Sequence, residues 1–172
     1  KFGPHMDAKS PSHDTAYSDL HTKSEFCAAC HNVTHPFNQL RIEETYDEWR
    51  ESRYNARGIH CQDCHMTPGT GLTANPGKSA PTGKERDRVS THSFDGGNSS
   101  LLKYLGKPEM AERARGLLRT AATLEFLELP SRIDPGEPVR VRLRVNNTGA
   151  GHKLPTGFPE GREVWLDFKV VD

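Results

Sequence analysis

Hydrophobic residues are scarce in this chain: they make up 33% of its 172 residues, and no apolar run approaches the ~18 residues of a membrane-spanning helix. Net charge is lacking too, because 23 basic residues balance 23 acidic ones. No overall field would draw the chain to nucleic acid or to an anionic membrane, so we predict neither a nucleic-acid partner nor a membrane span. This small supply of apolar side chains also predicts that a cofactor contributes buried apolar mass.

Cysteine is limited to four residues, and all four lie in two motifs of the form Cys-x-x-Cys-His. This spacing attaches a c-type haem, because two thiols separated by two residues reach the two vinyl groups of one porphyrin. The histidine that follows then lies under the iron as its proximal ligand. We therefore predict two covalently attached haems. The predicted attachment residues are Cys27, Cys30, Cys61 and Cys64, and the predicted proximal ligands are His31 and His65.

Two paired-cysteine motifs also fit a zinc site, in which thiolates bind the metal tetrahedrally. The usual connector in such a site is about 15 to 20 residues, whereas thirty residues separate Cys30 from Cys61. Neither a zinc site nor a pair of disulfides explains why a histidine directly follows the second cysteine of each motif. Haem attachment is the interpretation that uses all of these residues.

Haem attachment also predicts the compartment. Thioether-linked cytochromes mature outside the cytoplasm, so we expect a periplasmic or extracellular location, the latter at the cell surface. The sequence begins at Lys1 without a visible secretory leader. We expect that a leader has been removed.

The first part of the chain, residues 1–98, has much Gly, Pro, Ser and Asp and little periodicity. We predict a dihaem cytochrome c region that is mostly irregular, with a few short helices packed on the haems. One helix is expected to begin at Ser24. Another, of roughly three turns, is expected to begin at the capping box of residues 45–48 and to end at Gly58.

The rest of the chain reads as a helix followed by a sheet. Residues 99–122 are predicted to hold a connecting helix with Pro108 in its first turn, because apolar residues recur there at helical spacing. Residues 123–172 change to a period of two, which predicts an antiparallel β-sheet with strands near 124–129, 139–145 and 164–170. Because an Ig-like sandwich needs about seven strands, we expect a partial sandwich, in a fragment of a longer protein or completed by another subunit.

Several runs resemble the bacterial and archaeal multihaem c-type cytochromes. Residues 24–33, 45–49 and 58–66 carry the haem-region likeness, and residues 147–157 with 162–166 resemble the β-sandwich-like domain that some of these proteins append. The resemblance implies electron transfer through closely packed haems with histidine on both sides of the iron. It differs in haem number, because relatives commonly carry four or more motifs and this chain carries two.

The resemblance also points to distal ligands. The segment Gly151-His152-Lys153 would reach back to a haem iron, and the segment 91–96 matches one that often supplies a distal histidine through His92. Both histidines lie in glycine-containing loops, which allow close backbone approach to a porphyrin. We predict His92 and His152 as distal ligands. The alternatives are His13, His21 and His35.

Two classes of function remain open. In the first, both irons have six ligands and the chain is an electron carrier or conductor that works with redox partner proteins or neighbouring cytochrome subunits. A homo-oligomer or filament would suit such a role. In the second, one iron lacks a distal ligand and the chain is a haem oxidoreductase acting on a small nitrogen or sulfur compound. Seven histidines outside the proximal positions favour electron transfer, because two irons need only two of them.

Overall fold

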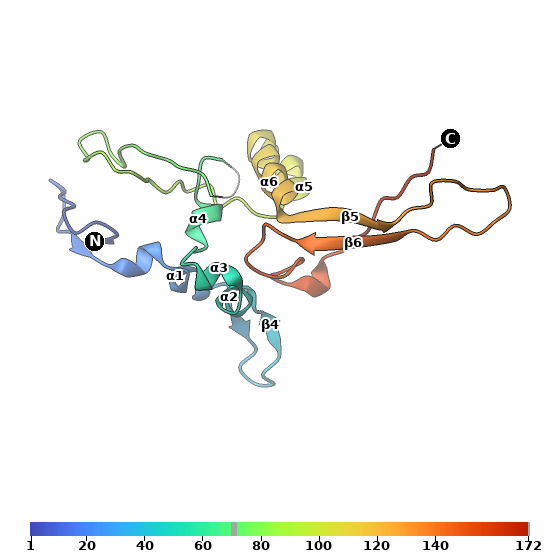
Figure 1. Cartoon of the computed structure of the whole chain (residues 1–172). Helices are drawn as coiled ribbons and strands as arrows, with labels where there is room; N and C mark the ends of the chain where they lie inside the picture. The colour runs from blue at the N-terminus through green and yellow to red at the C-terminus, as the bar shows by residue number, and fades with distance from the viewer. Residues whose placement is uncertain (70–71, 172) are drawn as a thin grey trace. The chain divides into compact units, whose positions relative to one another are not determined.

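The computed structural model describes residues 1–69 and 72–171, and it divides the chain into two compact units (Figure 1). Unit 1 contains residues 1–61 and 151–172, and unit 2 contains residues 62–150. The division falls inside the second Cys-x-x-Cys-His motif, after Cys61. The predicted functional division into residues 1–98, 99–122 and 123–172 is a different partition and stays a prediction.

Unit 1 is built from short helices and two-stranded ladders. β1 pairs in parallel with β2, and β3 pairs antiparallel with β4. The strands are β1 (Phe2–Gly3), β2 (Ala16–Tyr17), β3 (Val33–Thr34) and β4 (Arg41–Glu43). The helices are η1 (Asp19–Thr22), α1 (Glu25–Ala28), α2 (Thr45–Arg50), α3 (Arg53–Ala56) and η2 (Pro159–Gly161). The expected helix beginning at Ser24 is confirmed as α1, with Ser24 at its N-cap.

The predicted long helix from the capping box to Gly58 is wrong in two respects. It is split into α2 and α3, because Ser52 interrupts it and its Oγ accepts the Tyr54 N–H at 3.1 Å as a new N-cap. Thr45 is also not a cap, since α2 begins at Thr45 with Glu44 before it and no side-chain cap bond. The side chains of the expected capping box bind a distant loop instead.

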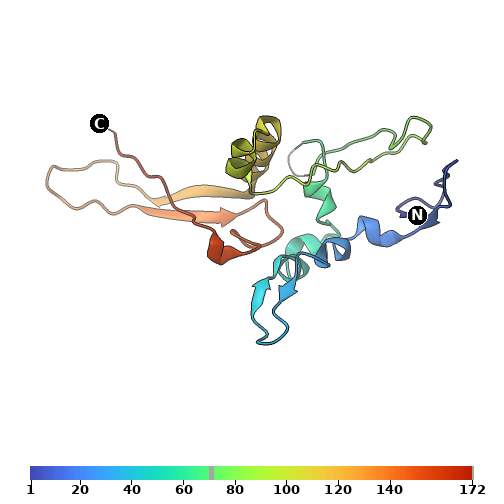
Figure 2. The same cartoon turned by 180° about the vertical axis from the view of Figure 1, so that it is seen from behind.

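Among its described residues, unit 2 contains three helices and a two-stranded ladder. These elements are α4 (Gln62–His65), α5 (Ser99–Tyr104), α6 (Pro108–Ala121), β5 (Ala122–Glu128) and β6 (Arg142–Asn147). α6 confirms the predicted connecting helix, with Pro108 in its first turn as expected. It packs against α5 (Figure 2), and the small side chains of Ala111 and Ala114 on α6 are buried.

The predicted sheet is only partly present. β5 and β6 confirm two expected strands and pair antiparallel, with Leu124 opposite Val145 and Phe126 opposite Leu143. The expected third strand at 164–170 is wrong, because residues 162–171 form no helix or strand despite their alternating pattern. An alternating pattern makes a strand only where a neighbouring strand can pair with it. Within the described residues no sheet has more than two strands, so the partial sandwich is reduced to a hairpin.

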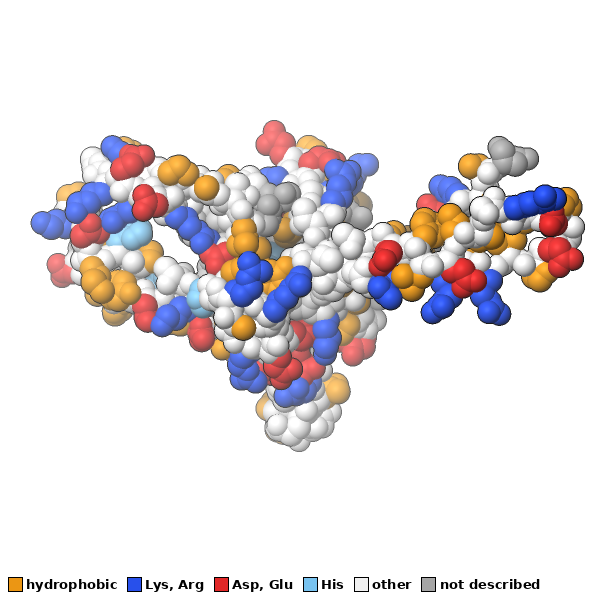
Figure 3. Space-filling model, in the orientation of Figure 1, with side chains coloured by type: hydrophobic (Ala, Val, Ile, Leu, Met, Phe, Trp, Pro, Cys, Tyr) orange, Lys and Arg blue, Asp and Glu red, His pale blue; other side chains and the backbone are white. Residues whose placement is uncertain are grey.

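Buried hydrophobic side chains are few. In the part of the chain that the structure describes they are Trp49, Ala111 and Ala114, while large apolar residues such as Phe26 and Phe37 are exposed. Figure 3 shows apolar side chains spread over the visible face. No described helix combines the length and apolar character needed to cross a bilayer. The expected shortage of an aliphatic core is therefore confirmed.

Candidate haem attachment site

The first motif begins on α1 and continues into the following turn. The backbone N–H groups of Cys30 and His31 both donate to the Cys27 carbonyl, at 3.1 and 2.9 Å. These bonds hold both cysteines and the histidine on one compact turn. Nδ1 of His31 lies 2.8 Å from Oε1 of Glu43 on β4. Because the His31 side chain is 62% exposed, this bond to Glu43 rather than burial orients the ring.

The second motif has the same arrangement with different partners. α4 carries Cys64 and His65, and the Met66 N–H closes its turn by donating to the Gln62 carbonyl at 3.1 Å. Nδ1 of His65 lies 2.5 Å from the backbone carbonyl oxygen of Asp95. Both predicted proximal histidines therefore have an oxygen acceptor at Nδ1.

An oxygen acceptor at Nδ1 assigns the tautomer of a neutral imidazole. The proton lies on Nδ1, and the lone pair that can bind a metal lies on Nε2. Metal-bound histidines are commonly held in this way, with a carboxylate or carbonyl accepting from the ring nitrogen remote from the metal. The ring chemistry of His31 and His65 thus fits an iron ligand.

Ser24 joins the beginnings of the two motifs. It is fully buried, and its Oγ accepts the backbone N–H of Cys61 at 3.0 Å. Its own backbone N–H donates to Nδ1 of His60 at 3.2 Å. The N-cap residue of α1 therefore fixes where the second motif starts, an interaction that no sequence pattern indicates.

The first cysteines of the two motifs are also in contact, because the thiols of Cys27 and Cys61 form a hydrogen bond. This bond lowers the pKa of Cys61 to about 7, with help from the Ser24 hydroxyl. The same bond, together with burial, raises the pKa of Cys27. The two motifs therefore begin at neighbouring sulfur atoms.

Asp95, whose carbonyl orients His65, is held by an arginine from α6. The Asp95 side chain is 6% exposed, and Arg113 donates to both of its carboxylate oxygens, with Nη2 to Oδ2 at 2.6 Å and Nε to Oδ1 at 3.2 Å. Nη2 of Arg113 also donates to the Thr67 carbonyl at 2.9 Å, and Nη1 donates to the Pro68 carbonyl at 3.1 Å. One guanidinium thus links Asp95, whose carbonyl bonds His65, to Thr67 and Pro68, which follow His65 in the chain.

We expect Arg113→Met to destabilise unit 2 and to loosen the orientation of the His65 ring. Removing Arg113 leaves the Asp95 carboxylate buried without its cation, which costs about 2–3 kcal/mol, less than for a fully buried pair because Arg113 is 35% exposed. Chemical unfolding followed by circular dichroism measures the loss. Arg115→Met is the matched control, since Arg115 pairs with the exposed Glu112 on the same helix and should change stability by less than about 0.5 kcal/mol. Equal effects of the two substitutions would contradict this role for Arg113.

The structure places the predicted distal ligands in different units. His152 belongs to unit 1, which also holds the first motif, and its Nδ1 lies 2.9 Å from the Lys153 carbonyl. His92 belongs to unit 2 and packs edge-on against Phe94, with ring centroids 6.0 Å apart. Its neighbour Thr91 donates its N–H to the Met66 carbonyl at 2.8 Å, so the His92 segment runs beside the second motif.

The other histidines differ in how Nδ1 is used. Nδ1 of His13 lies 3.1 Å from the Asp14 carbonyl oxygen, so this ring has the same tautomer as His31 and His65. His35 accepts from the N–H of Phe37 at 3.4 Å, and His60 accepts from the Ser24 N–H. In these last two rings the proton lies on Nε2, where an iron would have to bind. Hydrogen bonding therefore favours His13 and His152 over His35.

The zinc alternative finds no support in the geometry. Across residues 1–69 and 72–171, no three His, Cys, Asp or Glu side chains come together in a group that could hold a metal ion. The four thiols in particular are not gathered into a tetrahedral set.

Several residues of the site could not be found by sequence reasoning. Glu43 belongs to no motif, and Ser24 was expected only to begin a helix. Arg113 reads as one of several charged residues on an amphipathic helix. Asp95 lies in the segment 91–96, from which the sequence predicts His92 as a ligand. Its contribution to His65 is a backbone carbonyl, which any residue type can provide.

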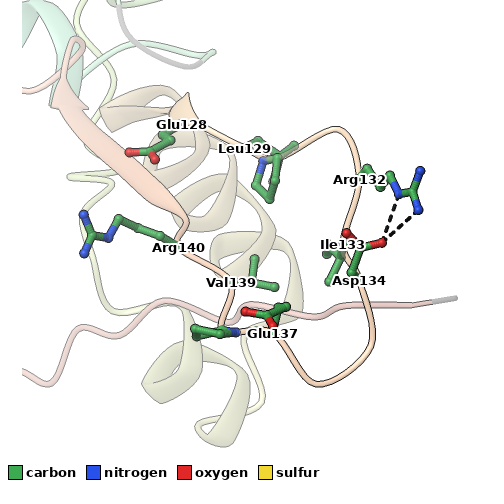
Figure 4. A pocket seen from close by; sticks show the side chains of 10 residues that line it. Glu128, Leu129, Arg132, Ile133, Asp134, Glu137, Val139 and Arg140 are labelled. Carbon is green, nitrogen blue, oxygen red and sulfur yellow. Dashed lines mark hydrogen bonds and ion pairs between the residues drawn. The ribbon is translucent and has the colours of Figure 1, made fainter.

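A separate hollow lies at the tip of the β5–β6 hairpin (Figure 4). Its walls include Leu129, Ile133 and Val139, and the ion pair of Arg132 with Asp134 stands at its rim. No cysteine or histidine lines it, so it takes no part in haem attachment.

Comparisons with known proteins give no match: no family model, no curated protein and no solved structure is similar to this chain. The likeness to multihaem cytochromes noted in the sequence therefore stays a resemblance.

Proposed function

We propose that this chain transfers electrons through two covalently attached c-type haems, as a multihaem cytochrome that acts in a larger protein, complex or filament. The observation that carries this proposal is the pair of Nδ1 hydrogen bonds. The histidine of each Cys-x-x-Cys-His motif donates to an oxygen, to Glu43 in one case and to Asp95 in the other. In both rings this leaves Nε2 as the metal-binding nitrogen.

The residues present fit haem in donor set and in polarity. Cys27 and Cys30 would hold one group, and Cys61 and Cys64 the other, in thioether bonds. The flanks of the first motif carry exposed apolar side chains, Phe26 before it and Val33 after it, which a porphyrin could cover. When bound, haem supplies an iron that cycles between ferric and ferrous states, and the axial ligands set its potential.

Proximity of the two sites supports electron transfer over substrate chemistry. The bond from Cys61 to Ser24 and the contact between the Cys27 and Cys61 thiols bring the attachment points together. Two redox centres attached at neighbouring sulfurs can exchange electrons directly. A single open iron that reduces a substrate has no need of this pairing.

We assign the distal positions to His92 and His152, each of which would supply one further iron ligand. His152 has its proton on Nδ1 and its lone pair on Nε2, the tautomer of the two proximal ligands. His13 has this tautomer as well and is the next candidate. Bis-histidine coordination leaves no position for a substrate, so the chain would act as a carrier or conductor rather than an enzyme.

The sheet supports the proposal that further chain or another subunit adjoins this one. The face of the hairpin that carries Leu124, Phe126 and Val145 is largely exposed. A lone two-stranded hairpin is only marginally stable in water, and additional strands would cover this face. Redox partners or neighbouring cytochromes in the periplasm or at the cell surface fit this arrangement.

Carbon monoxide tests the proposed function. We expect the reduced protein to form no carbon monoxide adduct, because histidine occupies both axial positions of each iron. The oxidised protein should show only low-spin iron at low temperature. An adduct at one haem, together with turnover of nitrite, hydroxylamine or sulfite by the reduced protein, would favour the oxidoreductase alternative instead.

A further inference from the structure

The loop of residues 151–157, which contains His152, is held against α2 by the carboxylate of Glu48. The Glu48 side chain is 12% exposed, and its Oε2 accepts two hydrogen bonds. One comes from the Lys153 N–H at 3.0 Å, and the other comes from the Thr156 hydroxyl at 2.7 Å. One nearly buried carboxylate therefore binds the loop at Lys153 and at Thr156, directly after His152 in the chain.

A second α2 residue reinforces this attachment. Thr45 Oγ1 accepts the Gly157 N–H at 3.1 Å and lies 2.8 Å from Thr156 Oγ1. At the other end of the loop, Gly151 lies so close to α2 and α3 that an added Cβ would come within 3.4 Å of Trp49 Cδ1. Both ends of the loop are thus fixed to the same helical surface.

The same hydrogen bonds continue to the first proximal histidine. Thr45 Oγ1 donates to Glu43 Oε1 at 3.3 Å, and this oxygen also accepts from Nδ1 of His31 at 2.8 Å. One continuous network, all within unit 1, therefore connects the ring of His31 with the loop of His152. Hydrogen-bond networks in which each polar group has a partner restrict the arrangements that their members can take.

We propose that Glu48 is a positioning residue that holds His152 in place as an iron ligand. This inference rests on the proposed function. The Glu48 carboxylate is not itself proposed as an iron ligand. It acts through Lys153 and Thr156, whose bonds limit where the His152 ring can lie. Without those bonds the loop keeps its bond from Gly157 to Thr45, but the position of the His152 ring would be less restricted.

The test compares Glu48→Ala, Glu48→Gln and Glu51→Gln in the mature haem-loaded protein, with His152→Ala as reference. Glu51 is an exposed residue at the C-cap of α2 and serves as the matched control. We expect Glu48→Ala to let carbon monoxide bind one of the two haems and to make that iron partly high-spin. Glu48→Gln should largely restore the low-spin spectrum, because its amide oxygen still accepts from Lys153 and Thr156. Glu51→Gln should change nothing.

Thr156→Val provides a second variant if Glu48→Ala fails to load haem, because it removes one of the two bonds and keeps the volume of the side chain. It should open the same haem to carbon monoxide. If His152→Ala opens a haem and neither Glu48→Ala nor Thr156→Val does, the role of Glu48 is overturned while electron transfer still stands. If His152→Ala leaves both irons low-spin, the ligand assignment and the role of Glu48 fail together.

Discussion

The mass of the mature protein, measured after denaturation, should equal that of the polypeptide plus two haem groups. Replacing Cys61 and Cys64 with alanine should remove one haem and leave the other in place. Thioether bonds survive denaturation, so mass spectrometry counts the attached groups directly. We expect the loss of only one haem because each motif has its own pair of thiols and its own predicted proximal histidine.

The matching double substitution of Cys27 and Cys30 is the control, and it should remove the other haem. The two variants need not be equally stable, because the Cys61 N–H bonds to Ser24 at the start of the first motif. Loss of both haems from either double variant would mean that the sites are loaded as one unit. A mature chain without any haem, or native protein with stoichiometric zinc, would contradict the proposal altogether.

Local sequence patterns predicted the elements whose causes are local. α6 follows from Pro108 and the helical spacing of its apolar residues, and α1 follows from Ser24. The β5–β6 hairpin follows from two alternating runs separated by the turn near Gly136. In each case the residues that specify the element lie inside it or beside it in the sequence.

The failures share one feature, which is that the outcome depends on segments that are distant in the sequence. Thr45 and Glu48 form a capping-box pattern, yet their side chains bind Thr156 and Gly157, more than a hundred residues away. A local rule contains no information about such partners. The run at 164–170 fails for the opposite reason, because its alternation is suited to a sheet whose neighbouring strand the described residues do not supply.

The candidate site divides in the same way. The haem-attachment residues are predicted from the sequence alone, because the proposed chemistry requires fixed spacing along the chain, and they stay a prediction. The groups that orient them could not, because an acceptor for His31 or His65 can be any oxygen that the fold brings within reach. One proved to be the carboxylate of Glu43, and the other the backbone carbonyl of Asp95.

Removing a distal ligand should have the largest spectroscopic effect of any single substitution outside the motifs. We expect His152→Ala to convert one of the two irons from low-spin to high-spin and to open it to carbon monoxide, because imidazole is replaced by water or by nothing. His92→Ala should do the same to the other iron. Absorption and low-temperature electron paramagnetic resonance spectra of the oxidised protein measure both changes.

His60→Ala is the control for these variants, because Nδ1 of His60 accepts the Ser24 N–H and its ring is thereby committed to a structural bond. It should keep both irons low-spin, even where it lowers stability. If His92→Ala leaves the spectrum unaltered while His152→Ala changes it, the second distal ligand is to be sought at His13, which shares the tautomer of the proximal histidines. An unaltered spectrum in both variants would move the choice to His13, His21 and His35 and would leave the covalent attachment of the haems unaffected.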